Sequence, residues 1–231
     1  MKKKNYKKTN TGKKLRISCI IPIRANSKRI KNKNFRKINK IPLVKFVLNN
    51  IQNSKYIDDF YVASEKLNNV KKIINNKKNI NFFLRSKKSS TQMAQTEVVI
   101  KELLKKIKTD ILILVQATNP FVKSKYLDNA IEKLINQRLD SILSVVKSKH
   151  FIWSNKKFSS PINYNIKQRK MSQSLKGYYV ENGSFYIFYR KNFLKTNNRL
   201  HGKIGVFEMP KESIFEIDDL DDLKIIRKLL S

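Results

Sequence analysis

A loop rich in cations and turn-forming residues follows the first apolar run of this chain. Residues 24–34 read RANSKRIKNKN. The backbone N–H groups of such a loop can cradle phosphates, and Arg24, Lys28 and Lys33 can neutralise them. The loop has neither a G-x-G-x-x-G pattern nor the glycines and Lys-Ser/Thr pair of a P-loop, which argues against NAD-binding and P-loop sites. Its spacing alone leaves two alternatives open, a phosphate-binding loop and a solvated basic loop.

A second polar turn follows a later apolar run. Residues 116–121 read QATNPF and come directly after DILILVQ at 110–116. In open parallel sheets, ligands bind at the carboxyl ends of the strands, so Gln116 is placed well for a ligand. A simple strand-to-helix connection is the alternative.

Two carboxylates near the C-terminus form a candidate metal site. Glu216 and Asp218 lie in IFEIDD, residues 214–219. In an extended chain their side chains point to the same face, because side chains alternate. Opposite a phosphate-binding loop, such a pair can hold a Mg²⁺ ion that bridges protein and triphosphate. The alternative is a solvated acidic turn that leads into a helix.

Other chemistry finds little support in the sequence. No Ser/His/Asp nucleophile arrangement stands out, and the two histidines, His150 and His201, lack metal-ligand spacing. We interpret both as structural or surface residues. The lone cysteine, Cys19, cannot form an internal disulfide and is expected to be a small buried hydrophobe in a strand. These features, and the lack of an apolar segment after the basic N-terminus, favour a cytoplasmic protein.

The elements that would position these residues alternate between strands and helices. Predicted strands cover residues 16–23, 59–64, 80–84, 110–116, 141–147, 184–189 and 203–209. Predicted helices cover residues 42–53, 67–76, 94–108, 124–137 and 220–230. This alternation predicts an α/β fold with a mostly parallel sheet covered by helices on both faces.

Two segments fall outside this alternation. Residues 1–14 are polar and basic without periodicity, and we predict a disordered tail before a single domain at 15–231. Residues 148–180 carry several aromatic residues and little periodicity, and we predict an extension from the core sheet. Burying those aromatic residues requires a partner surface, so we expect at least a homodimer.

The chain is strongly basic, with a formal net charge of +34 over 231 residues. Such a charge is typical of proteins that bind nucleic acid or anionic membranes. The basic residues are spread over the whole chain, however, and Lys, Asn and Ile are abundant, as an AT-rich genome favours. We therefore prefer composition bias to a nucleic-acid surface. No apolar run approaches the roughly 18 residues of a membrane helix, so no membrane partner is expected.

From about residue 16 to the C-terminus, the sequence resembles the CMP-N-acylneuraminate synthetases (acylneuraminate cytidylyltransferases). The matching segments are IPIRANSKRIKNKN (21–34), VQATNP (115–120), SVVKSKHFIW (144–153), ENGSFYIF (181–188), GKIGVFEMP (202–210) and IFEIDD (214–219). The resemblance implies a Rossmann-like nucleotidyltransferase fold. It also implies that residues 148–180 form a dimerisation extension reaching towards the partner's active site, in a homodimer or dimer of dimers.

The resemblance also implies roles for individual residues. Arg85 would contribute to the nucleotide site, and Gln116 and Tyr186 would lie at the sugar. Glu216 and Asp218 would bind Mg²⁺. The residues implied at the nucleotide are Arg24, Ala25, Asn26, Ser27, Lys28, Lys33, Asn34 and Arg85, among which Arg24, Lys28 and Lys33, together with Asp218, are the candidates for catalysis.

The chain departs from the family pattern at several positions. Ala25 and Asn26 replace a frequent Gly-Gly pair, Glu216 replaces an Asp, and Thr91-Gln92-Met93 replaces an Asp-containing turn. Met171 and Ser172 stand where the family has arginines, one of which meets the sugar carboxylate. Arg169 or Lys170 can take over that role after a small shift in alignment.

Together these observations predict transfer of CMP from CTP to the anomeric hydroxyl of a nine-carbon sugar acid. We expect a sialic acid first, legionaminic or pseudaminic acid next, and an eight-carbon sugar such as KDO last. The alternative is a non-catalytic, decayed family member that binds nucleotides or nucleic acid. Retention of Arg24, Lys28, Lys33, Gln116 and Asp218 argues for the enzyme.

Overall fold

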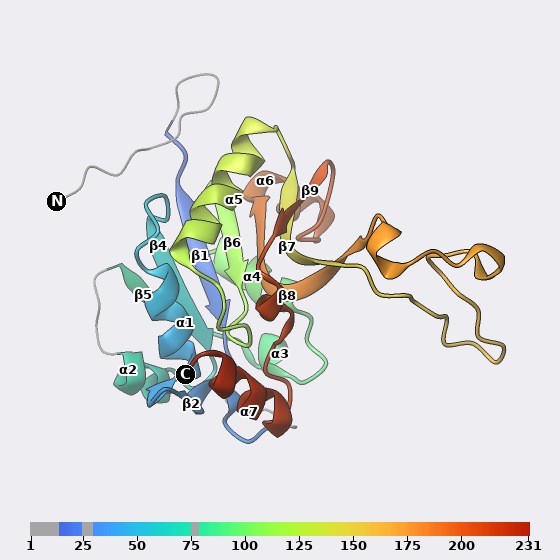
Figure 1. The fold of residues 1–231 in the computed structure, drawn as a ribbon. Helices are drawn as coiled ribbons and strands as arrows, with labels where there is room; N and C mark the ends of the chain where they lie inside the picture. The colour runs from blue at the N-terminus through green and yellow to red at the C-terminus, as the bar shows by residue number, and fades with distance from the viewer. Residues whose placement is uncertain (1–13, 25–29, 75–78) are drawn as a thin grey trace.

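A seven-stranded sheet forms the centre of the computed structural model, which describes residues 14–24, 30–74 and 79–231 (Figure 1). Its strand order is β5-β4-β1-β6-β8-β7-β9. The strands are β1 (Ile17–Pro22), β4 (Asp59–Ser64), β5 (Ile80–Leu84), β6 (Ile111–Val115), β7 (Ser141–Ser148), β8 (Tyr178–Tyr189) and β9 (Ile204–Glu208). Only β8 runs antiparallel to its neighbours within this sheet. The predicted α/β class with a mostly parallel sheet is confirmed.

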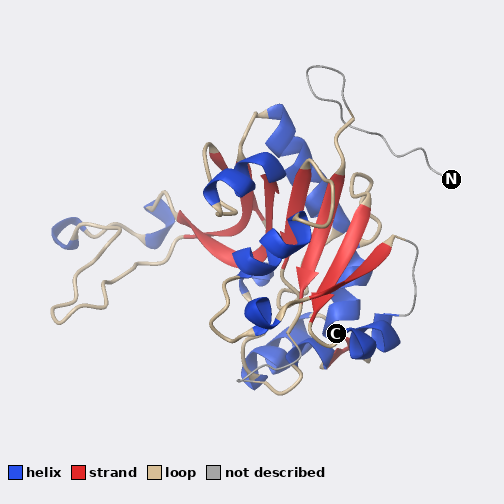
Figure 2. Cartoon of the chain, turned by 180° about the vertical axis from the view of Figure 1, so that it is seen from behind, coloured by secondary structure: helices blue, strands red, loops and turns tan. Residues whose placement is uncertain are grey.

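Helices cover both faces of the sheet (Figure 2). They are α1 (Leu43–Ile51), α2 (Leu67–Ile74), α3 (Lys87–Ser90), α4 (Thr96–Leu104), α5 (Ser124–Asn136), α6 (Arg190–Thr196) and α7 (Leu220–Leu229). Apolar residues of α1, α2, α5 and α7 share one core with one face of the sheet. Residues of α4 and α6 share a second core with the other face. This is the two-sided covering expected of a parallel sheet.

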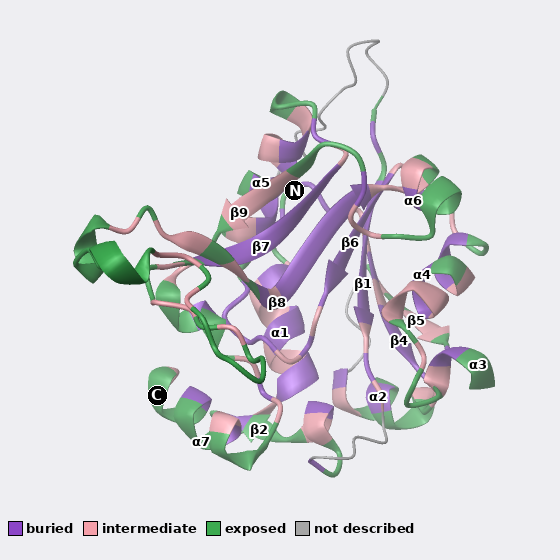
Figure 3. Cartoon of the chain, turned by 90° about the vertical axis from the view of Figure 1, so that its right-hand side faces the viewer, coloured by how far each residue is buried: buried purple, intermediate pink, exposed green. Residues whose placement is uncertain are grey.

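The central strands are apolar because both of their faces are buried (Figure 3). Every residue of β6 is fully buried, and Cys19 in neighbouring β1 has no exposed surface. The expectation that Cys19 is a small buried hydrophobe is confirmed. These two strands fix where their polar continuations, Arg24 and Gln116, leave the sheet.

Strand β8 is longer than predicted. The apolar run predicts a strand at 184–189, whereas β8 begins at Tyr178. The register against β7 shifts between Leu143 and Val145, and Gly183 opposite this irregularity has φ +60°. The polar sequence Glu-Asn-Gly at 181–183 hides the strand because a bulge breaks its alternation.

The segment between β7 and β8 projects from the sheet as an arm (Figure 1). We call residues 149–177 the extension; it contains the short 3-10 helices η2 (Ile166–Gln168) and η3 (Ser172–Ser174). A single bridge joins Trp153 to Pro161. Phe158 and Met171 are mostly exposed. Of the predicted extension at 148–180, Ser148 belongs to β7 and the last three residues belong to β8, and the rest lies outside the sheet.

Several short elements were not predicted. They are α3, α6, a small antiparallel pair formed by β2 (Lys37–Ile38) and β3 (Ile41–Pro42), and the 3-10 helices, including η1 (Lys33–Phe35) and η4 (Lys211–Ile214). Helix α6 buries little beyond Phe193, so its sequence lacks a helical apolar period. Helix α4 ends at Leu104, four residues before the predicted boundary. Among the described residues, no helix is long and apolar enough to cross a membrane.

Candidate active site

A cavity of about 310 Å³ opens where β1 and β6 end. Six of the residues singled out in the sequence line it: Arg24, Lys33, Asn34, Arg85, Gln116 and Asp218. They come from four separate parts of the chain, the loop at 24–34 and the segments around Arg85, Gln116 and Asp218, and the fold brings them together. Of the other nucleotide-site residues predicted, Ala25, Asn26, Ser27 and Lys28 lie outside the described residues.

Two arginines form one side of the cavity. Arg24 donates to the carbonyl oxygens of Thr91 (3.1 Å) and Gln92 (3.0 Å), which ties the first loop to the segment before α4. Arg85 is buried and donates to the carbonyl oxygens of Ile23 and Ser89. Its Nε has no hydrogen-bond partner among the described residues. Burial lowers the pKa of Arg85, yet a guanidinium keeps its proton, so a cation with an unused donor stands beside the cavity.

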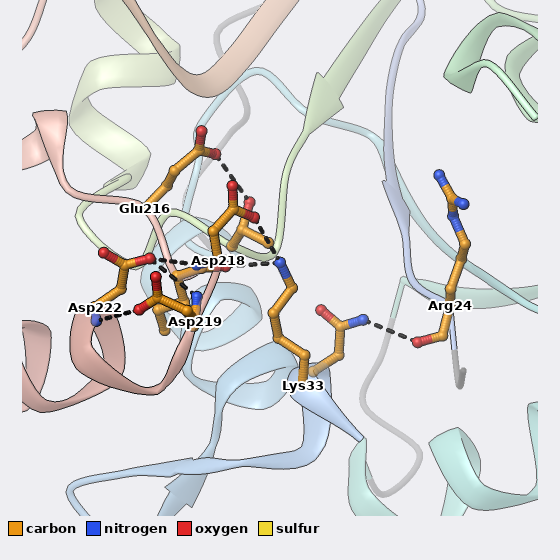
Figure 4. A network of polar contacts seen from close by, with 9 residues as sticks. Arg24, Lys33, Glu216, Asp218, Asp219 and Asp222 are labelled. Carbon is orange, nitrogen blue, oxygen red and sulfur yellow. Dashed lines mark hydrogen bonds and ion pairs between the residues drawn. The ribbon is translucent and has the colours of Figure 1, made fainter. Parts of the chain in front are cut away.

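Lys33 and Asp218 meet on the opposite side (Figure 4). Lys33 Nζ lies 3.0 Å from Asp218 Oδ1 and 2.7 Å from the carbonyl oxygen of Ile217. Its side chain is 14% exposed, against 44% for Asp218. Nearby, the Asn34 amide donates to the Arg24 carbonyl oxygen at 3.1 Å, which fixes the start of the loop. The two ends of the loop, at Arg24 and Asn34, are therefore anchored beside the cavity.

Glu216 lies next to Asp218 and is half-buried (Figure 4). Burial raises the pKa of the Glu216 carboxyl, and the negative charge of Asp218 raises it further. Thr118 Oγ1 donates to Glu216 Oε2 at 3.4 Å. A cation between the two carboxylates would relieve both causes of the raised pKa.

Gly183 allows the Glu216 carboxylate its position. A Cβ at Gly183 would lie 2.8 Å from Glu216 Oε2, and the φ of +60° also disfavours other residues. The glycine of the bulge in β8 therefore makes room for the acidic pair. This close approach is not readable from sequence spacing.

The neighbouring aspartates have a different role. Asp219 is the N-cap of α7 and accepts from the backbone N–H groups of Asp221 and Asp222. Asp222 in turn accepts from the backbone of Asp218 and Asp219. This capping box holds Asp218 in place. Within the described part of the chain, no group of three or more His, Cys, Asp or Glu residues is placed to hold a metal.

The fit of Mg²⁺ rests on Glu216 and Asp218. Magnesium in nucleotide sites is usually held by one or two carboxylates, with phosphate and water oxygens completing its shell. Two adjacent carboxylates at the edge of a cation-lined cavity fit that pattern. The residues present therefore suit Mg²⁺ in company with a phosphate ligand.

Tyr186 lies beside the cavity without lining it. Tyr186 on β8 pairs with Leu114 on β6, and Leu114 lies two residues before Gln116. The side chains of Tyr186 and Gln116 therefore leave the same face of the sheet. The Tyr186 hydroxyl donates to Glu181 Oε2 at 2.8 Å. Burial, followed by this hydrogen bond, raises the pKa of Tyr186 to about 12, so the hydroxyl keeps its proton at neutral pH.

Arg169 lies in the extension, away from the cavity of its own chain. Its guanidinium carbon is 4.5 Å from the ring centroid of Phe151 and 5.7 Å from that of Tyr164. The structure of one chain thus does not bring Arg169 to Gln116 or Tyr186. A role at the sugar would require a second copy.

The histidines make local contacts. His150 Nδ1 lies 2.7 Å from Ser148 Oγ in an exposed position, and His201 Nδ1 lies 2.9 Å from the carbonyl oxygen of Asn198. His201 is buried. This agrees with the expectation of surface and structural roles.

Some residues of the site were missed by sequence reasoning. Thr118 contacts Glu216, Glu181 accepts from Tyr186, and Thr96 lines the cavity. Buried Asn182 connects β8 to β7 and η4, because its side chain forms hydrogen bonds with Ser144 (2.7 Å) and Ser213 (2.9 Å). Glu181 and Asn182 belong to the ENG segment, whose polar residues inside a strand were the signal available in the sequence.

The fold and this site together are those of a nucleotidyltransferase. The family model described as "Cytidylyltransferase" matches residues 18–230. The chain therefore belongs to the cytidylyltransferase family, as the resemblance in its motifs predicted.

Individual relatives agree with this family. The chain is 29% identical to an N-acylneuraminate cytidylyltransferase of Oncorhynchus mykiss over 92% of this chain and 50% of that protein. It is 24% identical to a pseudaminic acid cytidylyltransferase of Campylobacter jejuni over 91% of this chain and 94% of that protein. The chain spans about half the length of the first of these curated relatives.

A solved structure shares the fold. The structure of CMP:2-keto-3-deoxy-manno-octonic acid synthetase complexed with CTP superposes with a TM-score of 0.68. The alignment covers 93% of this chain and 98% of that one, at 16% identity. This confirms the nucleotidyltransferase fold.

Proposed function

We propose that the chain transfers CMP from CTP to the anomeric hydroxyl of a nine-carbon ulosonic acid and releases pyrophosphate. The observation that carries the proposal is the cavity itself, with Arg24 and Arg85 on one side and Lys33 with Asp218 on the other. A triphosphate needs cations around its oxygens, and a divalent ion needs carboxylates. The names of the relatives supply the cytidine and the sugar-acid class.

In this proposal the cations bind and orient the nucleotide. Arg24 and Lys33 neutralise phosphate oxygens, with Lys28 from the same loop, and Arg85 adds a further positive charge beside the nucleotide. Arg24, Lys33 and Arg85 are held by hydrogen bonds before the ligand arrives. Preorganised donors aimed at developing charge stabilise a transition state more than the ground state.

Glu216 and Asp218 would hold Mg²⁺. When bound, Mg²⁺ would stabilise charge on the phosphate oxygens. Lys33 already holds Asp218 in place through the 3.0 Å ion pair. The capping box of α7 fixes the backbone on which Asp218 stands.

The sugar acid would lie against Gln116 and Tyr186. The anomeric oxygen bonds to the α-phosphorus and its proton is released to solvent. The bond from that phosphorus to the α,β-bridging oxygen breaks, and pyrophosphate leaves with that oxygen. Relatives that act on N-acylneuraminate and pseudaminic acid support a nine-carbon substrate, and we rank a sialic acid first.

The extension would complete the site in a homodimer. Its exposed Trp153, Phe158 and Met171 offer apolar surface to a second copy. In the dimer, Arg169 would reach the partner's sugar carboxylate as a bidentate donor. Sedimentation at micromolar concentration tests this part, since a monomer would contradict it.

The proposed function is tested by pyrophosphate release from CTP and Mg²⁺ with a panel of nine-carbon ulosonic acids. We expect release only when CTP and one of the sugar acids are both present. Absence of release with every sugar, while CTP still binds, would contradict the proposal. That result would instead favour a non-catalytic, nucleotide-binding member of the family.

A further inference from the structure

A second hollow adjoins the cavity. It has a volume of about 600 Å³ and is lined by residues 94–97 and 196–199. We call it the side pocket. The cavity and the side pocket share Ala94 and Thr96. Apart from Ala94, every residue that lines the side pocket is polar.

The cavity is too small for both reactants. Ligand sites span about 300–1,000 Å³ for one drug-sized ligand, and about 310 Å³ lies at the lower end of that range. A nucleotide triphosphate and a nine-carbon sugar therefore need adjoining space. The side pocket supplies it on the side of the sheet that carries Gln116 and Tyr186.

Arg199 lines the side pocket and lies against Tyr186. Its guanidinium carbon lies 4.5 Å from the ring centroid of Tyr186, and its Nη1 lies 3.1 Å from Glu97 Oε1. Both charged side chains are about three-quarters buried, with exposed fractions of 25% and 22%. The ring and the carboxylate fix the plane of the guanidinium before any ligand binds.

The loop that carries Arg199 is itself held in place. Lys101 on α4 donates to Asn197 Oδ1 at 2.8 Å, and the backbone of Leu200 donates to Asn198 Oδ1 at 3.0 Å. Asn197 adopts the left-handed conformation that ends α6. Arg199 is therefore positioned by α4 and α6 together.

The charge around Arg199 favours a neutral acceptor. A guanidinium has five N–H donors, and the ion pair with Glu97 involves only Nη1. Glu97 offsets the positive charge, so a phosphate or carboxylate would be repelled by Glu97 as well as attracted by Arg199. An amide carbonyl oxygen accepts hydrogen bonds without that penalty.

We propose that Arg199 is a specificity-determining residue that donates to the carbonyl oxygen of an acylamino group on the sugar acid, seated in the side pocket. This inference rests on the proposed function. The anomeric end of the sugar lies at Gln116, Tyr186 supports the ring, and the acylamino group reaches Arg199. The enzyme thereby prefers acylamino sugar acids to analogues with a hydroxyl at the same carbon.

The test uses two nine-carbon ulosonic acids that differ only in an acetylamino group or a hydroxyl at one carbon. For Arg199→Met we expect the KM of the acetylamino sugar to rise tenfold or more, with the KM of CTP within twofold. The preference for the acetylamino sugar in kcat/KM should fall by the same factor. If the hydroxyl analogue is not turned over, its Ki replaces its KM.

Two further variants keep the result readable. Arg199→Lys keeps the charge and the apolar stem but lacks the planar fork, so we expect a similar loss of preference. Arg227→Met is the matched control, because Arg227 on exposed α7 donates to the Lys37 carbonyl oxygen and does not line the side pocket. We expect this variant to leave the KM of the acetylamino sugar and the KM of CTP within twofold of the wild-type values.

Each outcome decides one point. A folded Arg199→Met protein whose sugar preference stays within twofold overturns the inference, as does a rise in the KM of CTP instead. If Arg199→Met does not fold, the same criteria apply to Arg199→Lys. If the wild-type protein turns over neither sugar, the proposed function is contradicted. This result is distinguishable from an unchanged sugar preference in Arg199→Met, which contradicts only the inference on Arg199.

Discussion

Around the cavity, Lys33, Asp218 and Arg85 are held by hydrogen bonds and an ion pair, whereas Arg169 in the extension lies against two aromatic rings. The strands beneath the cavity are fully buried, but the extension leaves Phe158 83% exposed. Side chains that bind phosphate and metal must be held to within a fraction of an ångström. The packing within a single chain is sufficient to hold them so. The extension lacks a hydrophobic core of its own. We therefore expect its side chains to be held in fixed positions only when they pack against a partner.

This comparison predicts different effects for changes in the two regions. Changes at the cavity should reduce kcat even in one isolated chain. Changes in the extension should act on sugar binding alone, and only where a partner is present.

Asp218→Asn should have the largest effect. It removes a carboxylate from the pair that would hold Mg²⁺ and leaves Lys33 without its ion-pair partner. We expect Mg²⁺-dependent turnover to fall by about three orders of magnitude or more, on the scale of a lost transition-state contact. Titration of turnover with Mg²⁺ measures this, and Asp221→Asn on the exposed start of α7 is the control. An unchanged Mg²⁺ titration would leave Asp218 as only the start of the last helix.

Lys33→Met should slow turnover by about two to three orders of magnitude, since it removes a preorganised cation worth about 3–4 kcal/mol. The Lys33 side chain is mostly buried, and methionine keeps its apolar stem. Steady-state kcat measures the effect, with Lys228→Met on exposed helix α7 as the matched control. Activity within twofold of wild type would remove Lys33 from the site.

Arg169→Ala tests the extension. We expect the KM for the sugar to rise at least tenfold while the KM for CTP stays nearly constant, because the arginine would act on the sugar carboxylate of the partner's site. The effect should disappear in protein diluted to monomer. An unchanged sugar KM in the dimer would point to Lys170 or to backbone donors.

Glu216→Gln should also lower Mg²⁺-dependent turnover, because Glu216 would hold the ion. Its effect on the stability of the metal-free protein is the smallest change that we expect. The pKa of Glu216 is raised in the folded state, so the folded protein binds more protons than the unfolded one as pH rises through the ordinary and raised values. The ionised carboxylate therefore destabilises the metal-free fold at neutral pH. We expect Glu216→Gln to raise Tm at pH 7 in EDTA, with the gain vanishing below the ordinary pKa of a glutamate. A lower Tm at pH 7 would contradict this.

Sequence patterns predicted much of this fold for an identifiable reason. Strands β1 and β6 are unbroken apolar runs because they are buried on both faces. The first half of β8 was missed because Glu181, Asn182 and Gly183 interrupt the apolar alternation where the bulge lies. Helix α6 was missed because it buries essentially one side chain.

The site was predicted unevenly for a similar reason. Arg24 and Gln116 follow the ends of β1 and β6, so topology alone brings them to one edge of the sheet. Asp218 comes between η4 and α7, and its place at the cavity depends on how these two elements pack. Glu181 and Arg199 reach Tyr186 through packing across the sheet and between α4 and α6. Spacing along the chain carries no information on such contacts.

Transfer of CMP to the anomeric oxygen of a nine-carbon sugar acid can be tested by following that oxygen atom. The sugar acid is labelled with ¹⁸O at its anomeric hydroxyl and incubated with CTP, Mg²⁺ and the protein, and the products are weighed by mass spectrometry. We expect a CMP-sugar that keeps the label, together with unlabelled pyrophosphate. A product without the label, or CTP left intact beside every nine-carbon sugar acid tried, would contradict it.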